Sequence, residues 1–116
     1  MKDPAAVKDR YVQARQRIRA LGEQSPERMD GFHTMLMAIE KEGALERKQK
    51  ELIAVALAVS RHSEWCLAYH TKQAILAGAT DEEIVEAAWM AVLLGGGPAL
   101  MQAASVLDIL QEIRGS

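Results

Sequence analysis

Three side chains that could do chemistry together lie in one short stretch, from Ser63 to His70, which also holds the only cysteine, Cys66. On a helix each residue advances by about 100° and rises by about 1.5 Å, so Ser63, Cys66 and His70 would fall within roughly 60° of one another. A helix that begins near Ser63 would place Cys66 in its first turn, where free N–H groups and the helix dipole favour a thiolate. The spacing therefore predicts a reactive thiol beside an imidazole. A small buried Cys66 next to a hydrogen-bonded His70 is the simpler alternative, and it stays open.

A carboxylate can join this pair if the preceding helix folds back on it. A turn between Ser60 and Ser63 would bring His70 within about one helical turn of both Glu51 and Cys66. The carboxylate would then hold the imidazole in one tautomer, and the imidazole would exchange a proton with the thiol or with a leaving oxygen. Alternatively, Glu51 is a solvated charge near the start of its helix, among basic neighbours.

The residues around this group have simpler predicted roles. Ser63 either caps the helix or donates a hydrogen bond to the thiolate, and the two roles can coexist. Trp65 and Tyr69 flank the thiol and are expected to wall a pocket or to contact another subunit. His62 is interpreted as a turn residue. The candidate catalytic residues are therefore Cys66, His70, Glu51 and Ser63.

The rest of the chain is typical of helices. Apolar residues recur at three- and four-residue spacing, Ser25 precedes Pro26 as a cap precedes a first helical residue, and Thr80 and Glu83 form a capping box. Glycines mark the expected helix ends. The predicted helices span residues 3–21, 25–43, 45–59, 63–77, 80–94 and 98–115. This pattern predicts a single all-α domain, residues 1–116, of about six helices in which sequential neighbours run antiparallel.

Two segments carry further information about packing. The run from Leu52 to Val59 is apolar on every side, which predicts that other helices or another subunit enclose it. Gly95-Gly96-Gly97-Pro98 is the strongest break, and a tight turn fits it better than a phosphate-binding loop because no strand precedes it. After this break we expect an inward-facing stripe of Leu100, Met101, Ala104, Leu107, Leu110 and Ile113.

Composition excludes several classes of function. The chain has 49 % hydrophobic and 26 % charged residues and a net charge of −2, so no basic field predicts nucleic-acid or anionic-lipid binding. One cysteine makes neither an internal disulfide nor a metal-ligating cluster, and we predict neither a metal nor a cofactor. We see no signal peptide and no apolar run of the ~18 residues that span a bilayer. We therefore expect a cytoplasmic protein without a membrane partner.

These motifs resemble those of the carboxymuconolactone decarboxylase family, and within it the alkyl hydroperoxidase D-like branch. The similar segments are Lys50 to Ala54, Glu64-Trp65-Cys66 with His70, Ala77 to Ile84, and Gly95 to Ala99, together somewhat more than half of the chain. The redox branch carries a glutamate, then Cys-x-x-Cys, then a histidine four residues later. Glu51, Cys66 and His70 match the glutamate, the second cysteine and the histidine, whereas Ser63 stands in place of the first cysteine.

The resemblance implies a compact helical subunit that assembles as a trimer or hexamer. It also implies reduction of a small hydroperoxide by the Cys66 thiolate, with Glu51 and His70 managing protons. Because Ser63 cannot close a disulfide, an external thiol or dithiol would have to resolve Cys66. Two alternatives stay open: a non-redox lyase or isomerase that acts on a lactone acid through His70, and a catalytically silent helical assembly.

Overall fold

The computed structural model describes the backbone of residues 4–115 and the side chains of residues 12–115, and this part of the chain contains helices and no strand. The helices are α1 (Pro4–Gln24), α2 (Pro26–Glu40), α3 (Arg47–Ser60), α4 (Glu64–Leu76), α5 (Asp81–Ala103) and α6 (Ser105–Gly115). The predicted all-α architecture of six helices is confirmed.

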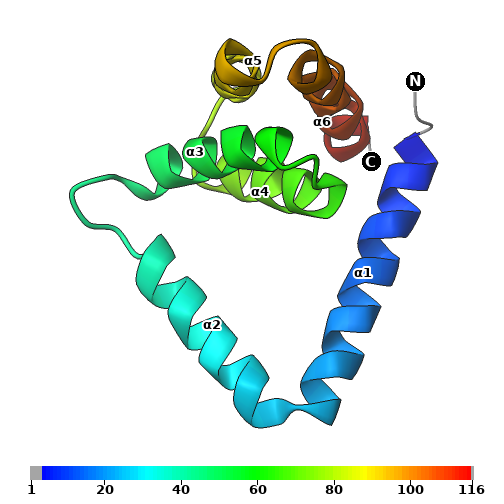
Figure 1. Cartoon of the computed structure of the whole chain (residues 1–116), viewed down its shortest axis with the longest axis vertical. Helices are drawn as coiled ribbons and strands as arrows, with labels where there is room; N and C mark the ends of the chain where they lie inside the picture. The colour runs from blue at the N-terminus through cyan, green and yellow to red at the C-terminus, as the bar shows by residue number, and fades with distance from the viewer. Residues whose placement is uncertain (1–3, 116) are drawn as a thin grey trace.

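Helices α3 and α4 form the centre of the molecule (Figure 1). They lie side by side and run in opposite directions, because the chain reverses at residues 61–63. Helix α5 packs along α3, and α6 packs against α5, α4 and α1. The fold-back that the candidate site requires is therefore present.

The core is built mainly from small and medium apolar side chains where α3, α4, α5 and α6 meet. Its members are Val55, Ala58, Val59, Leu67, Ala74, Ala79, Ile84, Ala88, Ala91, Ala99, Val106, Ile109 and Leu110. The alanines let helix axes approach closely, and the branched residues fill the space between them. Helix α3 buries only one side, because Ile53 and Leu57 remain about half exposed. The expectation that helices enclose the whole α3 run is thus not met within one chain.

Helices α1 and α2 form the two arms of a V that points away from this core (Figure 1). Helix α2 has no buried residue. Sequence reasoning expected Gly22 to end the first helix and the two helices to pack as an antiparallel pair. Instead, α1 continues through Gly22 to Gln24, and only Ser25 separates it from α2. One residue is too short a connection for two helices to fold back on each other, so they splay apart.

Local sequence explains most of the other helix ends. Glu46 caps α3 in a capping box with Gln49, and Thr80 and Glu83 form the predicted box at the start of α5. Gly78 follows α4 with a φ of 96°, a conformation that glycine adopts at little cost. Ser25 precedes α2 as predicted, but its side chain makes no capping hydrogen bond.

The C-terminal third differs from the predicted pattern. Gly96 leaves helical geometry (φ 65°, ψ −145°), which confirms a break in the glycine run, but helical hydrogen bonding resumes at once and α5 continues to Ala103. A tight turn at Ala104 then starts α6. The buried face after Gly96 lies about one residue away from the predicted stripe, so the prediction is wrong at Leu100, Met101, Ala104 and Leu107, which are exposed, whereas Ala99, Val106 and Ile109 are buried.

Helix α5 is also long and apolar enough, by length and composition alone, to cross a membrane. We did not expect such a segment from the sequence. The kink at Gly96 divides it, and its residues Ile84, Ala88 and Ala91 belong to the core of the folded domain. In the described structure it therefore serves as a core helix, with a large exposed apolar side.

Candidate functional site

The candidate site begins at the reversal between α3 and α4. His62 adopts a φ of 55°, and the backbone N–H groups of His62 and Ser63 donate to the carbonyls of Val59 and Ala58. The Oγ of Ser63 then accepts a hydrogen bond from the backbone N–H of Cys66 at 3.3 Å. This contact confirms Ser63 as the cap of α4 and places Cys66 in the first turn. The second predicted role of Ser63, as a hydrogen-bond donor to the thiolate, stays a prediction.

The second part of the site is a buried carboxylate bonded to an imidazole. Glu51 on α3 is 1 % exposed, and its Oε1 lies 2.7 Å from Nδ1 of His70 on α4. Its Oε2 accepts a hydrogen bond from Nε of Arg47 at 3.0 Å, and Arg47 also reaches Gln73. The alternative of a solvated Glu51 is therefore wrong: the helix pairing turns this side chain inward.

These contacts determine the charge of Glu51. Burial alone would raise the pKa of Glu51, but the hydrogen bonds from His70, Glu40 and Arg47 outweigh it, and the pKa lies below the ordinary value. An ionised Glu51 that accepts at Oε1 leaves the proton of His70 on Nδ1 and the lone pair on Nε2. That is the form in which an imidazole can take a proton from a thiol.

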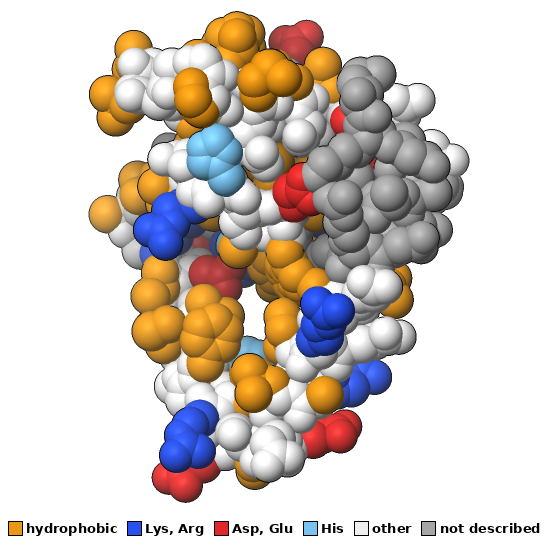
Figure 2. Space-filling model, turned by 45° about the vertical axis from the view of Figure 1, so that its right-hand side comes forward, with side chains coloured by type: hydrophobic (Ala, Val, Ile, Leu, Met, Phe, Trp, Pro, Cys, Tyr) orange, Lys and Arg blue, Asp and Glu red, His pale blue; other side chains and the backbone are white. Residues whose placement is uncertain are grey.

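Cys66 and His70 both line one large cavity of about 800 Å³. The cavity lies between α4 and the V of α1 and α2, and Figure 2 shows the opening framed by hydrophobic side chains. Cys66 is exposed, so the thiol is accessible. Glu51 does not line the cavity but lies behind His70. Carboxylate, imidazole and solvent-accessible thiol are thus arranged from the protein interior outward.

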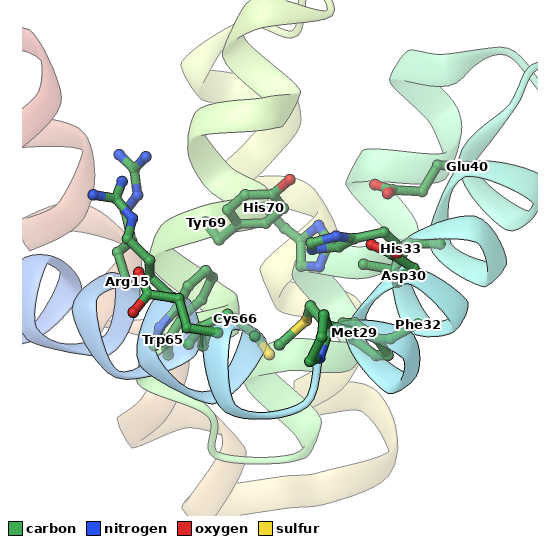
Figure 3. A pocket seen from close by; sticks show the side chains of 16 residues that line it. Arg15, Met29, Asp30, Phe32, His33, Glu40, Trp65, Cys66, Tyr69 and His70 are labelled. Atoms are coloured by element: carbon green, nitrogen blue, oxygen red, sulfur yellow. The ribbon is translucent and has the colours of Figure 1, made fainter.

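Aromatic rings form one wall of this cavity, as the sequence predicted. Trp65 and Tyr69 both line it, with ring centroids 5.2 Å apart. The Tyr69 ring meets the His70 imidazole edge to face, with ring centroids 5.0 Å apart. This contact restrains the orientation of the imidazole. Figure 3 shows these side chains around the thiol.

The opposite wall comes from residues that sequence reasoning did not place in the site. Helix α2 contributes Met29, Phe32, His33, Leu36 and Glu40, and α1 contributes Arg15 and Ile18 (Figure 3). The α2 residues recur at three- and four-residue spacing, so a polar residue that continues an apolar stripe was the available signal for Glu40. Nothing in the sequence indicated that this stripe would face Cys66.

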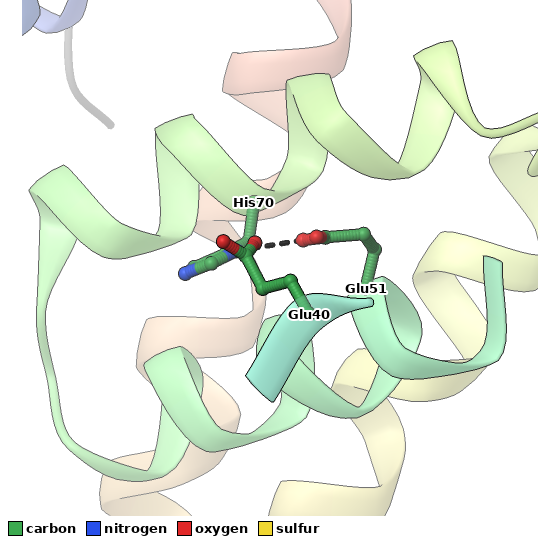
Figure 4. Close-up of side chains that lie close together, drawn as sticks. All are labelled: Glu40, Glu51 and His70. Atoms are coloured by element: carbon green, nitrogen blue, oxygen red, sulfur yellow. Dashed lines mark hydrogen bonds and ion pairs between the residues drawn. The ribbon is translucent and has the colours of Figure 1, made fainter. Parts of the chain in front are cut away.

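Glu40, Glu51 and His70 form a compact polar cluster (Figure 4). One ligand atom from each lies within 4.8 Å of the others, close enough to surround a cation. However, Nη2 of Arg47 lies 3.7 Å from Glu40 and its Nε bonds to Glu51, so the guanidinium already supplies positive charge there. This arrangement suits proton exchange better than metal binding.

Comparison with known proteins identifies the family of the chain. Residues 24–108 match the carboxymuconolactone decarboxylase family. The chain is 37 % identical over 101 residues to an uncharacterized protein of Cupriavidus necator, which covers 87 % of this chain and 89 % of that one. It is 39 % identical over 87 residues to uncharacterized protein 4 in the cox locus of Paracoccus denitrificans, covering 75 % of this chain and 78 % of that one.

Solved structures show the same fold. A carboxymuconolactone decarboxylase family protein from Legionella pneumophila, crystallised in its apo form, superposes with a TM-score of 0.88 at 37 % identity, covering 92 % of this chain and 96 % of that one. A Thermotoga maritima family protein, described as "possibly involved in antioxidative response", gives 0.80 at 26 % identity, with 91 % of each chain covered. These matches are consistent with the alkyl hydroperoxidase D-like branch. The chain belongs to the carboxymuconolactone decarboxylase family.

Proposed function

We propose that this protein is a thiol-dependent peroxidase that reduces small organic hydroperoxides at Cys66. The observation that carries the proposal is an accessible thiol in the first turn of a helix, in the same cavity as an imidazole that is bonded to a buried carboxylate. Low thiol exposure would have argued against attack on a peroxide. The antioxidative description of the Thermotoga maritima relative supports the same class of chemistry.

The proposed reaction uses the protein's own groups for every proton. His70 takes the proton of Cys66, and the resulting thiolate sulfur attacks the outer oxygen of the hydroperoxide. The O–O bond breaks, sulfur is oxidised to sulfenic acid, and the leaving alkoxide takes the proton from His70 to become an alcohol. Glu51 stabilises the imidazolium that forms between these two transfers.

The second half of the cycle requires an external reductant. With Ser63 in the motif, the chain has no second cysteine to close a disulfide. One external thiol would displace hydroxide, released as water, to form a mixed disulfide with Cys66. A second thiol, or the other sulfur of a dithiol, would then release the Cys66 thiol and leave as a disulfide.

A second candidate follows from the polar pair alone. The Glu51–His70 pair is complete without the thiol, and His70 lines the cavity. Such a pair could move a proton on a lactone acid in a non-redox lyase or isomerase reaction. A catalytically silent helical assembly is the third possibility, because most of the apolar side of α5 is uncovered in one chain.

Mass spectrometry of Cys66 separates the candidates. After one equivalent of cumene hydroperoxide, the peroxidase proposal expects a sulfenic acid that a small thiol reverses, and it expects Cys66→Ser to abolish turnover. His70→Ala should lower the rate by about 10²-fold or more, the usual contribution of acid–base catalysis. No oxidation, or oxidation that thiols cannot reverse, would contradict the peroxidase proposal.

The matched control replaces a histidine outside the cavity. His62→Asn keeps a residue that tolerates the positive φ of this position, so the turn is preserved. Its turnover should equal that of the unmodified protein. Activity on a lactone acid that survives Cys66→Ser but not His70→Ala would support the lyase instead.

We further propose that the protein is a homo-oligomer, a trimer or hexamer, in the reducing cytoplasm. Exposed apolar residues gather on α5, with Trp89, Leu93 and Leu94 at 54 %, 73 % and 93 % exposure. Monomers rarely leave such large contiguous side chains in water. Light scattering should give a mass that is three or six times the 12.8 kDa of one chain. Leu94→Arg should reduce that mass, and Glu42→Arg in the loop before α3 should not; a monomeric parent protein would refute the assembly.

A further inference from the structure

Glu40 is the one carboxyl group in the cluster with Glu51 and His70 that the proposed reaction does not use. It is the last residue of α2 and lines the cavity, and it approaches Glu51 and His70 from the side opposite to α4 (Figure 4). Its Oε2 is buried from water and accepts no hydrogen bond within the described structure. A buried carboxylate oxygen without a donor is costly, whereas a protonated oxygen is itself a donor and needs an acceptor.

The charges around Glu40 show why it should keep its proton. A carboxylate oxygen of Glu40 lies within 4.8 Å of one of Glu51, and two carboxylates this close repel each other when both are ionised. Arg47 is the cation that faces both, but its Nε hydrogen bond goes to Glu51, and Glu40 lies 3.7 Å from its Nη2. Glu51 has the better partners, so it holds the negative charge.

We infer that Glu40 is a neutral carboxylic acid that donates its proton to Glu51 and thereby positions the Glu51–His70 pair. A donor on Glu51 holds its carboxylate in place and keeps the proton of the pair on Nδ1 of His70. Ionisation of Glu40 would remove that donor and place a second negative charge beside the imidazole. The imidazolium would then release its proton less readily to a leaving oxygen.

The direction of the pKa of Glu40 agrees with this geometry. Burial raises the pKa of Glu40, and hydrogen bonding and repulsion with Glu51 raise it further, while Arg47 and His70 act in the opposite direction. The nearby cation Lys50 is directed to the carbonyls of Ile39 and Lys41. The other charged or titratable groups that line the cavity are Arg15, Arg19, Glu23, Asp30, His33 and Tyr69.

The inference deepens the proposed function, but its test does not depend on turnover. The full chain, labelled with carboxyl ¹³C-glutamate and ¹⁵N-histidine, is titrated by NMR. Glu40→Gln assigns the Glu40 signal and Glu42→Gln, a change at an exposed loop residue, is the matched control. The Glu40 carboxyl should titrate above the ~4.3 of an ordinary glutamate. The His70 ring nitrogens should show an inflection at the same pH, present in Glu42→Gln and absent in Glu40→Gln.

The outcomes are distinct. A Glu40 carboxyl that titrates at or below the ordinary value, or His70 nitrogens that show no inflection with it, would overturn the inference. If Glu40→Gln fails to fold, Glu40→Asp, which removes the labelled glutamate signal but keeps a carboxyl group, assigns the signal in its place. A chain that shows both inflections but reduces no hydroperoxide would uphold the role of Glu40 and contradict the proposed function.

Discussion

Replacing Glu51 by glutamine tests the central contact of the site without changing its size. The amide oxygen can accept from either His70 or Arg47, but the amide nitrogen must then face the other donor. One of two charge-assisted hydrogen bonds is lost, and a buried N–H group is left facing another donor. The substitution therefore removes charge and hydrogen bonding at a residue that is 1 % exposed.

The expected cost follows from the burial of the three partners. Breaking a fully buried ion pair costs about 3–5 kcal/mol, and losing one hydrogen bond to a charged group costs about 1.5–3 kcal/mol. Arg47 is 40 % exposed, so water replaces part of its lost contact. We expect Glu51→Gln to lower the free energy of unfolding by about 3 kcal/mol. With a urea slope of about 1.5 kcal/mol/M, the midpoint should fall by about 2 M.

The matched control is Glu83→Gln. Glu83 also pairs with a cation, Lys48 at 3.1 Å, but both side chains are more than one third exposed. Glutamine can keep the capping box with Thr80, so this change should lower the free energy of unfolding far less than Glu51→Gln does. Both variants are unfolded in urea at one protein concentration and followed by circular dichroism. Equal losses in the two variants would refute a buried, ion-paired Glu51.

The pH dependence provides a second check on the same variant. Because the pKa of Glu51 is lowered on folding, its stabilisation is fully present above the ~4.3 of the unfolded chain and is lost as the pH falls through the folded pKa. The difference in stability between the parent protein and Glu51→Gln should therefore shrink in acid. A difference that grows as the pH falls would contradict this sign.

Three further predictions concern protonation, the core and the kink. Because the pKa of Glu40 is raised, the folded state holds the Glu40 proton more tightly than the unfolded chain, so the stability of the parent protein should fall as the pH rises from ~4.3 to that pKa. Glu40→Gln should lack this decline when both proteins are unfolded in urea across a range of pH. Parallel curves of stability against pH would contradict the prediction. Leu67→Ala should lower the free energy of unfolding by about 2–5 kcal/mol, because Leu67 is fully buried. Leu76→Ala, at a side chain that is 70 % exposed, should lower it far less in the same assay. Equal losses would place Leu67 outside the core. Gly96→Ala should destabilise the protein by about 1–2 kcal/mol, because Gly96 has a φ of 65°. Gly97→Ala should be tolerated, because position 97 has open space and no positive φ. The reverse order of the two variants in thermal unfolding would contradict the kink.

The secondary structure was largely predictable from the sequence. Apolar spacing and cap signals located all six helices, and boxes such as Thr80 with Glu83 act over a few residues, so local sequence decides them. The resemblance carried Glu51, Cys66 and His70 into one hypothesis, and the short reversal after Ser60 made their proximity a geometric expectation. The structure places Glu51 against His70 and gives Cys66 and His70 a shared cavity.

The clearest error concerns the face that is buried after the glycine run. Apolar residues occupy two neighbouring faces of this segment, and the structure buries Ala99, Val106 and Ile109 and leaves Leu100 and Leu107 exposed. A periodic pattern identifies candidate faces, but packing against other helices decides which of them is buried.

From sequence alone came the all-α class, the helices and the set of groups capable of thiol and proton chemistry, because these depend on spacing within about one or two turns. Only the tertiary structure decided that Glu51 is buried, that α2 places Glu40 beside it, and that the α1–α2 arms form the wall opposite Cys66. Those outcomes depend on how helices far apart in the chain pack, and packing weighs burial, charge and chain connection together, which no local pattern encodes.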